Sequence, residues 1–254
     1  MMWSMPVLKP PMRMSMPMLE LTRSIRSLAE HNEPPSCYRE FIQENIYSVI
    51  KHTFPLFCAQ LNQQSLCTLA DEWLVRHGAT EPEFHQIASE LLQFIQQHNG
   101  YHINMNLSAE QIALLEYEWI VFNAEMDTAH VLDFKVCWDD VAAQPQGFCL
   151  QLNPTLKLIE VPFVVHPESV TFFTHPQERV CYGVFRHATH QVVSQKLRDL
   201  DIALIQMIQS NPTCSVMQLE QQIAQSLANF HFLAWVQSFD WKGLISLRLL
   251  GETQ

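Results

Sequence analysis

The first half of the chain repeats its hydrophobic positions every three or four residues, which is the spacing of amphipathic helices. In the segment 38–53, Phe41, Ile46 and Ile50 fall along one side of such a helix. The same spacing predicts further helices over residues 19–29, 64–76, 84–97 and 109–126. Ser108 and Gln111 form a capping-box pattern at the start of the last of these. The first half is therefore predicted to be a helical bundle.

The hydrophobic period changes near residue 133. Segments that mix β-branched and aromatic residues with polar ones predict strands over 135–141, 148–161, 170–173 and 179–197. Helical spacing returns over 198–211 and 216–244, and a last strand is predicted over 245–250. The predicted fold class is α+β, with an N-terminal helical bundle followed by a smaller α+β domain that holds a β-hairpin and winged-helix-like elements.

We expect three parts along the chain: a flexible arm over 1–18, a helical domain over 19–130, and an α+β domain over 131–254 that binds a peptide or partner. The arm is rich in methionine but interrupted by prolines, so it lacks the apolar core of a signal peptide. No window approaches the ~20 apolar residues of a membrane span, so no membrane partner is expected. Seven cysteines are scattered without a CxxC pair, which predicts free thiols and a reducing, cytoplasmic location.

Charge narrows the range of partners. The chain has 26 acidic and 15 basic residues and a formal net charge of -11. Binding to nucleic acid draws most of its sequence-independent affinity from clustered Lys and Arg, which release counterions from the phosphates. We therefore expect no nucleic-acid partner.

The chain offers no clear catalytic or metal-binding cluster. The histidines come close in the sequence to at most one other potential metal ligand, and a metal site needs three or four ligands. These pairs are His187 with His190, His98 with His102, and His130 with Asp133. With six glycines in the chain, phosphate-binding loops are nearly excluded. The neighbouring acids Glu116 and Glu118, and Asp139 and Asp140, are typical of a solvated face. We expect no catalytic residue, metal or cofactor in this chain.

A binding role fits the sequence better. Residues 179–197 predict a two-stranded ribbon, and an exposed strand edge can accept an extended peptide through main-chain hydrogen bonds. The alternative is a wing that only packs on its own helices. If the edge of the first strand accepts a peptide, the expected contact residues are Val180, Tyr182, Val184, Phe185 and Arg186.

Several short motifs, in order, resemble one family. They are Tyr38-Arg39, Asn45, Thr53-Phe54-Pro55, LADEWLVRHG at 69–78, ELLQFI at 90–95, Glu118-Trp119 with Ala124, and NPTLKLIEVPFVV at 153–165. The chain is similar over about residues 19–250 to proteins long labelled as DNA-binding-domain proteins that act in the maturation of ribosomal peptides, of the MbnC/HvfC type. Tyr117 departs from the family pattern, which has Leu before the Glu-Trp pair.

The resemblance implies a non-catalytic partner subunit that forms a heterodimer with an iron-dependent TIM-barrel oxygenase. In the methanobactin pathway such a pair converts cysteines of a precursor peptide to oxazolone and thioamide groups, and the product chelates copper. The resemblance implies that the iron belongs to the barrel subunit. Three alternatives stay open, of which two are a helper for a different cysteine-modified ribosomal peptide and an acidic winged-helix DNA-binding regulator. A third is a stand-alone enzyme that uses His or Cys residues.

The shared motif has a structural and an interface interpretation. Arg39 and Asn45 are six residues apart and so do not share a helix face. We expect Arg39 to pair with a carboxylate such as Glu118 and Asn45 to hold a loop, while Phe54 and Pro55 end the helix. The set forms a scaffold or the docking surface for the oxygenase: Tyr38, Arg39, Asn45, Thr53, Phe54, Pro55, Glu118 and Trp119.

Overall fold

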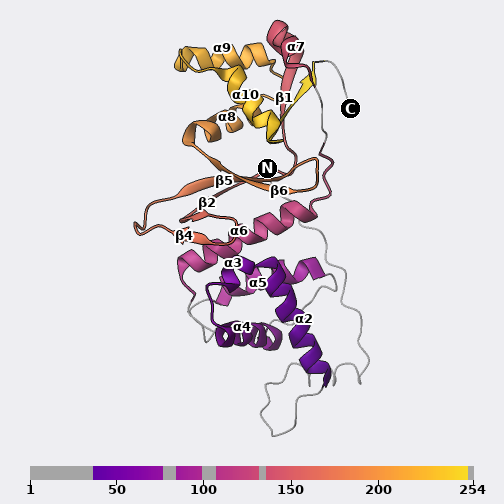
Figure 1. The fold of residues 1–254 in the computed structure, drawn as a ribbon, viewed down its shortest axis with the longest axis vertical. Helices are drawn as coiled ribbons and strands as arrows, with labels where there is room; N and C mark the ends of the chain where they lie inside the picture. The colour runs from indigo at the N-terminus through magenta and orange to yellow at the C-terminus, as the bar shows by residue number, and fades with distance from the viewer. Residues whose placement is uncertain (1–36, 77–83, 99–106, 132–135, 251–254) are drawn as a thin grey trace. The chain divides into compact units, whose positions relative to one another are not determined.

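A computed structural model describes residues 37–76, 84–98, 107–131 and 136–250 (Figure 1). Its helices are α2 (Cys37–Thr53), α3 (Pro55–Cys58), α4 (Gln63–Arg76), α5 (Phe84–His98), α6 (Ala109–Met126), α7 (Trp138–Ala143), η1 (Pro145–Gly147), α8 (Asp199–Ser210), α9 (Val216–Ser226) and α10 (Phe232–Trp241). Its strands are β1 (Phe148–Leu152), β2 (Lys157–Val161), β3 (Phe163–Val165), β4 (Val170–Phe172), β5 (Val180–Arg186), β6 (Val192–Leu197) and β7 (Ile245–Leu249). The predicted α+β class is confirmed. The expected arm over 1–18 and the helix over 19–29 lie outside the described residues.

Contacts divide the described residues into two compact units: one holds α2, α4 and α5, and the other holds α3, α6 and the later elements. This division differs from the expected boundary near residue 130. The helices α3 and α6 belong to the second unit, because α6 contacts α3 on one side and β2 and β5 on the other. In the first unit, the buried side chains of α4 and α5 include Trp73, Leu69, Leu91 and Ile95.

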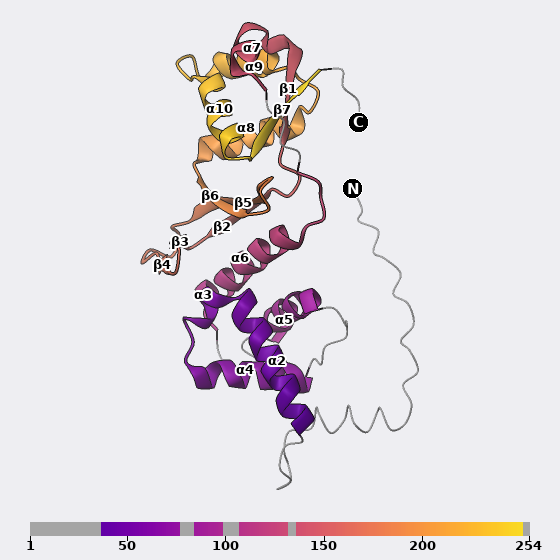
Figure 2. The same ribbon diagram turned by 45° about the vertical axis from the view of Figure 1, so that its right-hand side comes forward.

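The second unit is built around a three-stranded antiparallel sheet in the order β2-β5-β6. Figures 1 and 2 show α6 on one side of this sheet and α8 to α10 on the other. Every residue of β5 from Val180 to Phe185 is buried. A strand covered on both faces needs apolar side chains on both, which explains the unbroken VCYGVF run of β5. The sheet thus has its most apolar strand at its centre.

The C-terminal helices fold with a second small sheet. Strand β1 pairs antiparallel with β7. The backbone of Cys149 in β1 also forms an isolated antiparallel β-bridge with Ser215, the N-cap residue of α9. Ser215, β1 and β7 therefore lie side by side next to the three helices α8 to α10. This is a winged-helix-like arrangement in which one strand, β1, precedes the helices in the chain.

Two predicted strands need correction. The prediction over 135–141 is wrong for its second half, because α7 begins at Trp138. Asp139 and Asp140 lie in its first turn, where carboxylates favour the positive end of a helix. The predicted strand over 148–161 is two strands, β1 and β2, in different sheets, with a turn between them. The periodicity of the side chains continues across this turn, so pattern alone does not reveal it.

The side chain of Asn153 holds this turn. Its Nδ2 donates to the carbonyl oxygens of Arg186 at 2.9 Å and Gly243 at 2.8 Å. Its Oδ1 accepts from the backbone N–H of Thr155 at 2.9 Å and from Thr155 Oγ1 at 2.7 Å. All four hydrogen-bonding positions of the amide are used. Asn153 therefore joins the β1–β2 turn to the end of β5 and to the turn before β7.

Gly243 allows the turn before β7 to come close to Asn153 and His187. Its φ is +77°, a conformation that other residues adopt only with strain. A Cβ there would lie 2.4 Å from the His187 ring. The turn before β7, which Asn153 joins to the other two segments, therefore needs glycine at position 243.

Asn153→Asp should destabilise the chain by at least about 2 kcal/mol, because a carboxylate has no hydrogen to give to the carbonyls of Arg186 and Gly243. The measurement is the free energy of unfolding in urea. Gln221→Glu makes the same amide-to-carboxylate change on the exposed side of α9 and should cost less than about 0.5 kcal/mol. Equal losses in the two variants would contradict a junction role for Asn153.

Candidate functional site

The strand predicted to bind a peptide is not an edge. Val180, Tyr182, Val184, Phe185 and Arg186 all lie in β5, which pairs with β2 on one side and β6 on the other. A further strand needs unpaired backbone groups, so the expectation of strand addition at β5 is wrong. The edges of this sheet are β2 and β6. The side chains of β5 instead form the core beneath them.

The register identifies which backbone groups of β6 are free to pair. The N–H of His187 donates to the carbonyl of Gln191 at 2.8 Å, and this pair continues the β5–β6 register. Hydrogen-bonded and non-hydrogen-bonded pairs alternate along an antiparallel ladder. Every second residue counted from Gln191 therefore bonds β5. The residues whose N–H and C=O groups point away from β5 are Val192, Ser194 and Lys196.

A groove of about 630 Å³ opens between the end of β6 and α10. We call it the β6–α10 groove. Trp235 and Phe239 of α10 contribute aromatic rings to its lining, and Lys196, Arg198 and Lys242 contribute cations. The ammonium of Lys242 lies 4.9 Å from the centre of the Phe239 ring. The groove therefore combines an apolar lining with positive charge in a chain whose net charge is negative.

A buried carboxylate fixes the wall of this groove. Asp201 accepts from Arg198 Nη2 at 2.9 Å and Nε at 3.0 Å, and from Trp235 Nε1 at 2.8 Å. Burial alone would raise the pKa of Asp201, but the hydrogen bonds from Arg198 and Trp235 outweigh it and lower the pKa. Asp201 thus stays ionised and holds both the Arg198 guanidinium and the Trp235 ring in place.

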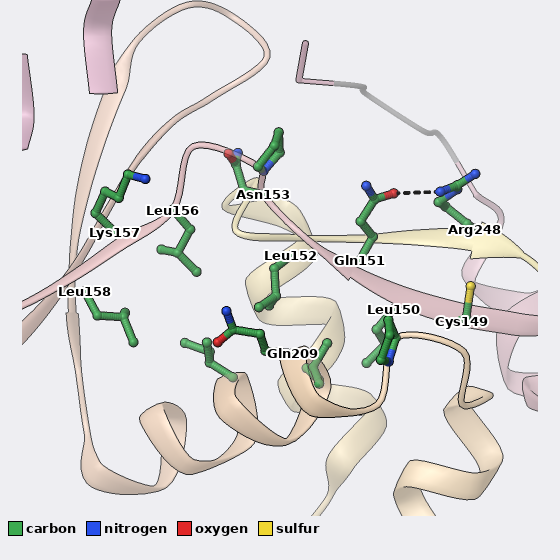
Figure 3. A pocket seen from close by; sticks show the side chains of 14 residues that line it. Cys149, Leu150, Gln151, Leu152, Asn153, Leu156, Lys157, Leu158, Gln209 and Arg248 are labelled. Atoms are coloured by element: carbon green, nitrogen blue, oxygen red, sulfur yellow. Dashed lines mark hydrogen bonds between the residues drawn. The ribbon is translucent and has the colours of Figure 1, made fainter. Parts of the chain in front are cut away.

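A second groove, of about 670 Å³, lies between β1, the start of β2 and α8 (Figure 3). We call it the β1–α8 groove. Figure 3 shows Leu152, Leu156 and Leu158 near Gln209 of α8, and a hydrogen bond of 3.2 Å from Arg248 to Gln151. The backbone β-bridge between Cys149 and Ser215 already occupies the outer side of β1 at Cys149. Less of the β1 edge is therefore open to another strand than of the β6 edge.

The motif residues Thr53, Phe54 and Glu118 are buried within the second unit, and Pro55 beside them is exposed. Phe54 is fully buried, Thr53 is buried, and Pro55 begins α3. The Glu118 carboxylate accepts from the backbone N–H of Leu56 at 2.7 Å and from that of Phe57 at 2.8 Å. Glu118 therefore holds the first turn of α3 against α6, which is a scaffold role.

The other motif residues are less informative. Tyr38, Arg39 and Asn45 lie in α2, where Asn45 is half-buried and the side chains of Tyr38 and Arg39 are outside the described residues. The expected pairing of Arg39 with a carboxylate stays a prediction. The carbonyl of Trp119 accepts from Asn123 Nδ2 at 2.8 Å within α6.

Tyr117, the departure from the family pattern, links α6 to the edge strand. Its hydroxyl donates to Ser194 Oγ at 2.8 Å, and its ring lies 5.9 Å from that of Tyr182. Burial raises the pKa of the Tyr117 hydroxyl, so it remains a donor. A leucine could not make this bond. Tyr117 therefore helps to position the centre of β6.

Sequence reasoning missed the edge strand and its lysine, Lys196. The signal was available in the composition of the two strands: 180–185 is almost wholly apolar, whereas 194–196 is Ser-Gln-Lys. Central strands are apolar on both faces, and edge strands carry polar residues and Lys. The neighbour of Lys196 in the groove, Lys242, lies beyond a helix and could not have been placed from the sequence.

No group of three or more His, Cys, Asp or Glu side chains that could hold a metal ion occurs in the described ranges, whose gaps include His102 and Asp133. None of the described helices combines the length and apolarity that crossing a bilayer requires.

The region from the Asn153 turn to the end of α10 also has a known counterpart. Residues 153–240 match the family model of the HvfC C-terminal domain. The match covers about a third of the 254-residue chain and includes the three-stranded sheet, both of its edges and most of the β6–α10 groove. It supports the resemblance to MbnC/HvfC-type partner proteins over this part of the second unit. No curated protein matches the chain significantly.

The second helix of the winged-helix-like part carries no basic residue. In a helix-turn-helix the second helix enters the major groove, and here that helix is α10. Its exposed positions include Ala234, Ser238 and Trp241, the last 73% exposed. Phosphate contacts are made by Lys and Arg, and α10 contains neither.

The pKa of Glu118 has a consequence for stability. Burial raises the pKa to about 7, although the two backbone hydrogen bonds oppose this. The ordinary pKa of a glutamate side chain is 4.5. Between about pH 4.5 and about 7, Glu118 is therefore protonated in the folded chain and ionised in the unfolded chain. The resulting stabilisation is complete below about pH 4.5 and is lost as the pH rises through about 7.

We therefore expect the free energy of unfolding to fall by up to about 3 kcal/mol between about pH 5 and about pH 8, measured by urea titration. Glu118→Gln should remove this slope, since the amide does not titrate. Glu125→Gln, an exposed change on the same helix, should leave it intact. A slope that survives in Glu118→Gln would assign the pH dependence to another group.

Proposed function

We propose that this chain is the non-catalytic partner subunit of an iron-dependent TIM-barrel oxygenase. The pair would act in the cytoplasm as a heterodimer and convert cysteines of a ribosomal precursor peptide to oxazolone and thioamide groups, as in the biosynthesis of methanobactin-type copper chelators. The iron belongs to the barrel subunit, and this chain supplies binding and orientation. Its helical first unit would contact the barrel, and its second unit would hold the leader part of the precursor.

The observation that carries this proposal is an open strand edge within the region that matches the HvfC C-terminal domain. The sheet is fixed on both faces, by α6 and by the core of α8 to α10, so its edge is presented rigidly. A rigid edge lowers the entropy cost of binding an extended peptide.

The test is the mass of a cysteine-containing precursor peptide after aerobic incubation with the iron-loaded barrel subunit, with and without this chain. We expect a mass change only when both proteins are present. The precursor with its cysteines replaced by serine is the matched control and should keep its mass in the complete mixture.

Three outcomes would contradict the proposal. Modification by the barrel subunit alone at the same rate would remove the partner role. Modification by this chain alone would make it an enzyme. An unchanged peptide in the complete mixture, with both proteins folded and the barrel loaded with iron, would leave the fold resemblance without the function.

The winged-helix-like arrangement of α8 to α10 is the observation that favours the second candidate, an acidic DNA-binding regulator. Binding to duplex DNA that falls steeply with salt would be its signature. The uncharged exposed face of α10 predicts that no such binding is found. A different cysteine-modified ribosomal peptide as product would appear in the mass assay as a different mass change.

A further inference from the structure

We propose that a pocket between α2 and α4 binds an arginine side chain that a partner protein presents. This inference deepens the proposed contact of the first unit with a partner. It rests on the proposed function only for the identity of that partner, which would be the barrel subunit. It adds the place of contact and the chemistry of the side chain that binds.

The pocket has a volume of about 390 Å³ and lies within the first unit. Polar side chains of both helices line it: Gln43, Glu44 and Tyr47 of α2, and Gln63, Cys67 and Asp71 of α4. Two of these side chains are carboxylates, and none of the residues that line the pocket is a cation. The pocket therefore offers negative charge and oxygen acceptors without the positive charge that would balance them.

The carboxylates keep acceptors that the fold does not use. Gln43 Nε2 donates to Asp71 Oδ1 and so joins α2 to α4 at the pocket. In the described part of the chain, the second oxygen of Asp71 and the Glu44 carboxylate form no hydrogen bond or ion pair. A guanidinium carries several N–H donors in one plane and pairs with carboxylates through parallel hydrogen bonds. Arginine therefore fits these acceptors better than the compact ammonium of lysine.

Tyr47 gives a second, independent indication that the pocket takes a ligand. Its hydroxyl oxygen is buried and has no hydrogen-bond partner among the described residues. Buried polar groups are nearly always paired, so an orphaned hydroxyl beside a pocket indicates a missing partner. An N–H of the guanidinium would supply it. The Tyr47 ring also lies 4.6 Å from the ammonium of Lys51, which shows that a cation is accommodated beside it.

A polypeptide is a better source of the guanidinium than free arginine. The α-carboxylate of free arginine would add negative charge to a pocket that already holds two carboxylates, whereas a peptide bond would not. Phe41 lies one helical turn before Glu44 on the same side of α2, and it is 59% exposed. Exposed aromatic side chains and arginines are enriched in protein interfaces. Phe41 would pack against the partner next to the bound arginine.

The test uses the exposed thiol of Cys67 as a reporter, because it lines the pocket. The full chain is alkylated with iodoacetamide in the presence of N-acetyl-arginine amide, and each cysteine is followed by peptide mass spectrometry. A ligand of this size should bind with a Kd of about 1 mM. We expect slower alkylation of Cys67 and an unchanged rate at Cys137, an exposed cysteine of the second unit.

Other ligands separate charge, shape and source, with ionic strength kept equal by NaCl. N-acetyl-citrulline amide has the shape of the arginine ligand without its charge and should bind at least about tenfold more weakly. N-acetyl-lysine amide and free arginine should also bind more weakly than blocked arginine. Equal protection of Cys67 by the citrulline and arginine ligands, or no protection by either, would overturn the proposal. Tighter binding of the lysine ligand or of free arginine would also overturn it.

Protein variants locate the site. Asp71→Asn keeps an acceptor for Gln43 but loses the charge, and Glu44→Gln loses the other charge. Each should weaken binding of the arginine ligand by about threefold to fivefold. Glu125→Gln is the matched control, since it removes the same charge from an exposed position on α6 and should leave binding unchanged. Circular dichroism confirms that each variant is folded. An equal loss in the control would make the effect one of net charge and overturn the site.

Association with the iron-loaded barrel subunit tests the partner. Asp71→Asn and Phe41→Ser should each weaken the complex by at least about fivefold, and Glu125→Gln should not. Unchanged association in the first two variants would overturn the assignment of this partner. The precursor mass assay stays independent: failure of Cys67 protection with a positive mass assay would leave the proposed function intact, and the reverse result would leave the arginine site without that function.

Discussion

The junction made by Asn153 is the interaction on which the second unit depends. One amide satisfies two carbonyls from distant segments and two donors from its own turn, and no other uncharged side chain except glutamine offers that set. It places the β1–β2 turn against the end of β5 and the turn before β7. Because the two sheets meet here, the three-stranded sheet and the winged-helix-like part share one core, which includes Phe185, Leu197 and Leu244.

That shared core limits which part of the sheet is open to a partner. Helix α6 covers one face of the sheet and the C-terminal helices cover the other, so its surface is available only along its edges. Tyr117 bonds Ser194 at the middle of β6 and supports that edge from the α6 side. An edge held from both faces keeps a fixed position, which lowers the entropy cost of pairing with an extended partner.

The net charge of the chain does not show where its charged side chains gather. The chain carries a net charge of -11, which opposes the long-range attraction of polyanions such as DNA. Yet the β6–α10 groove collects Lys196, Arg198 and Lys242 around aromatic rings, with its one carboxylate neutralised. The formal charge therefore describes the long-range field of the protein, whereas recognition of a short segment depends on a few side chains brought together by folding.

The sequence by itself determined the α+β class, the helices α2, α4, α5 and α6 within a few residues, and the hairpin of β5 and β6, because these follow from local periodicity and capping. It also carried the resemblance, whose C-terminal part the match over residues 153–240 supports. Only the tertiary structure decided that β5 is central and β6 an edge, because strand order depends on contacts between segments far apart in the chain. It likewise decided the partners of Glu118, whose backbone donors lie about sixty residues away and leave no mark in the sequence.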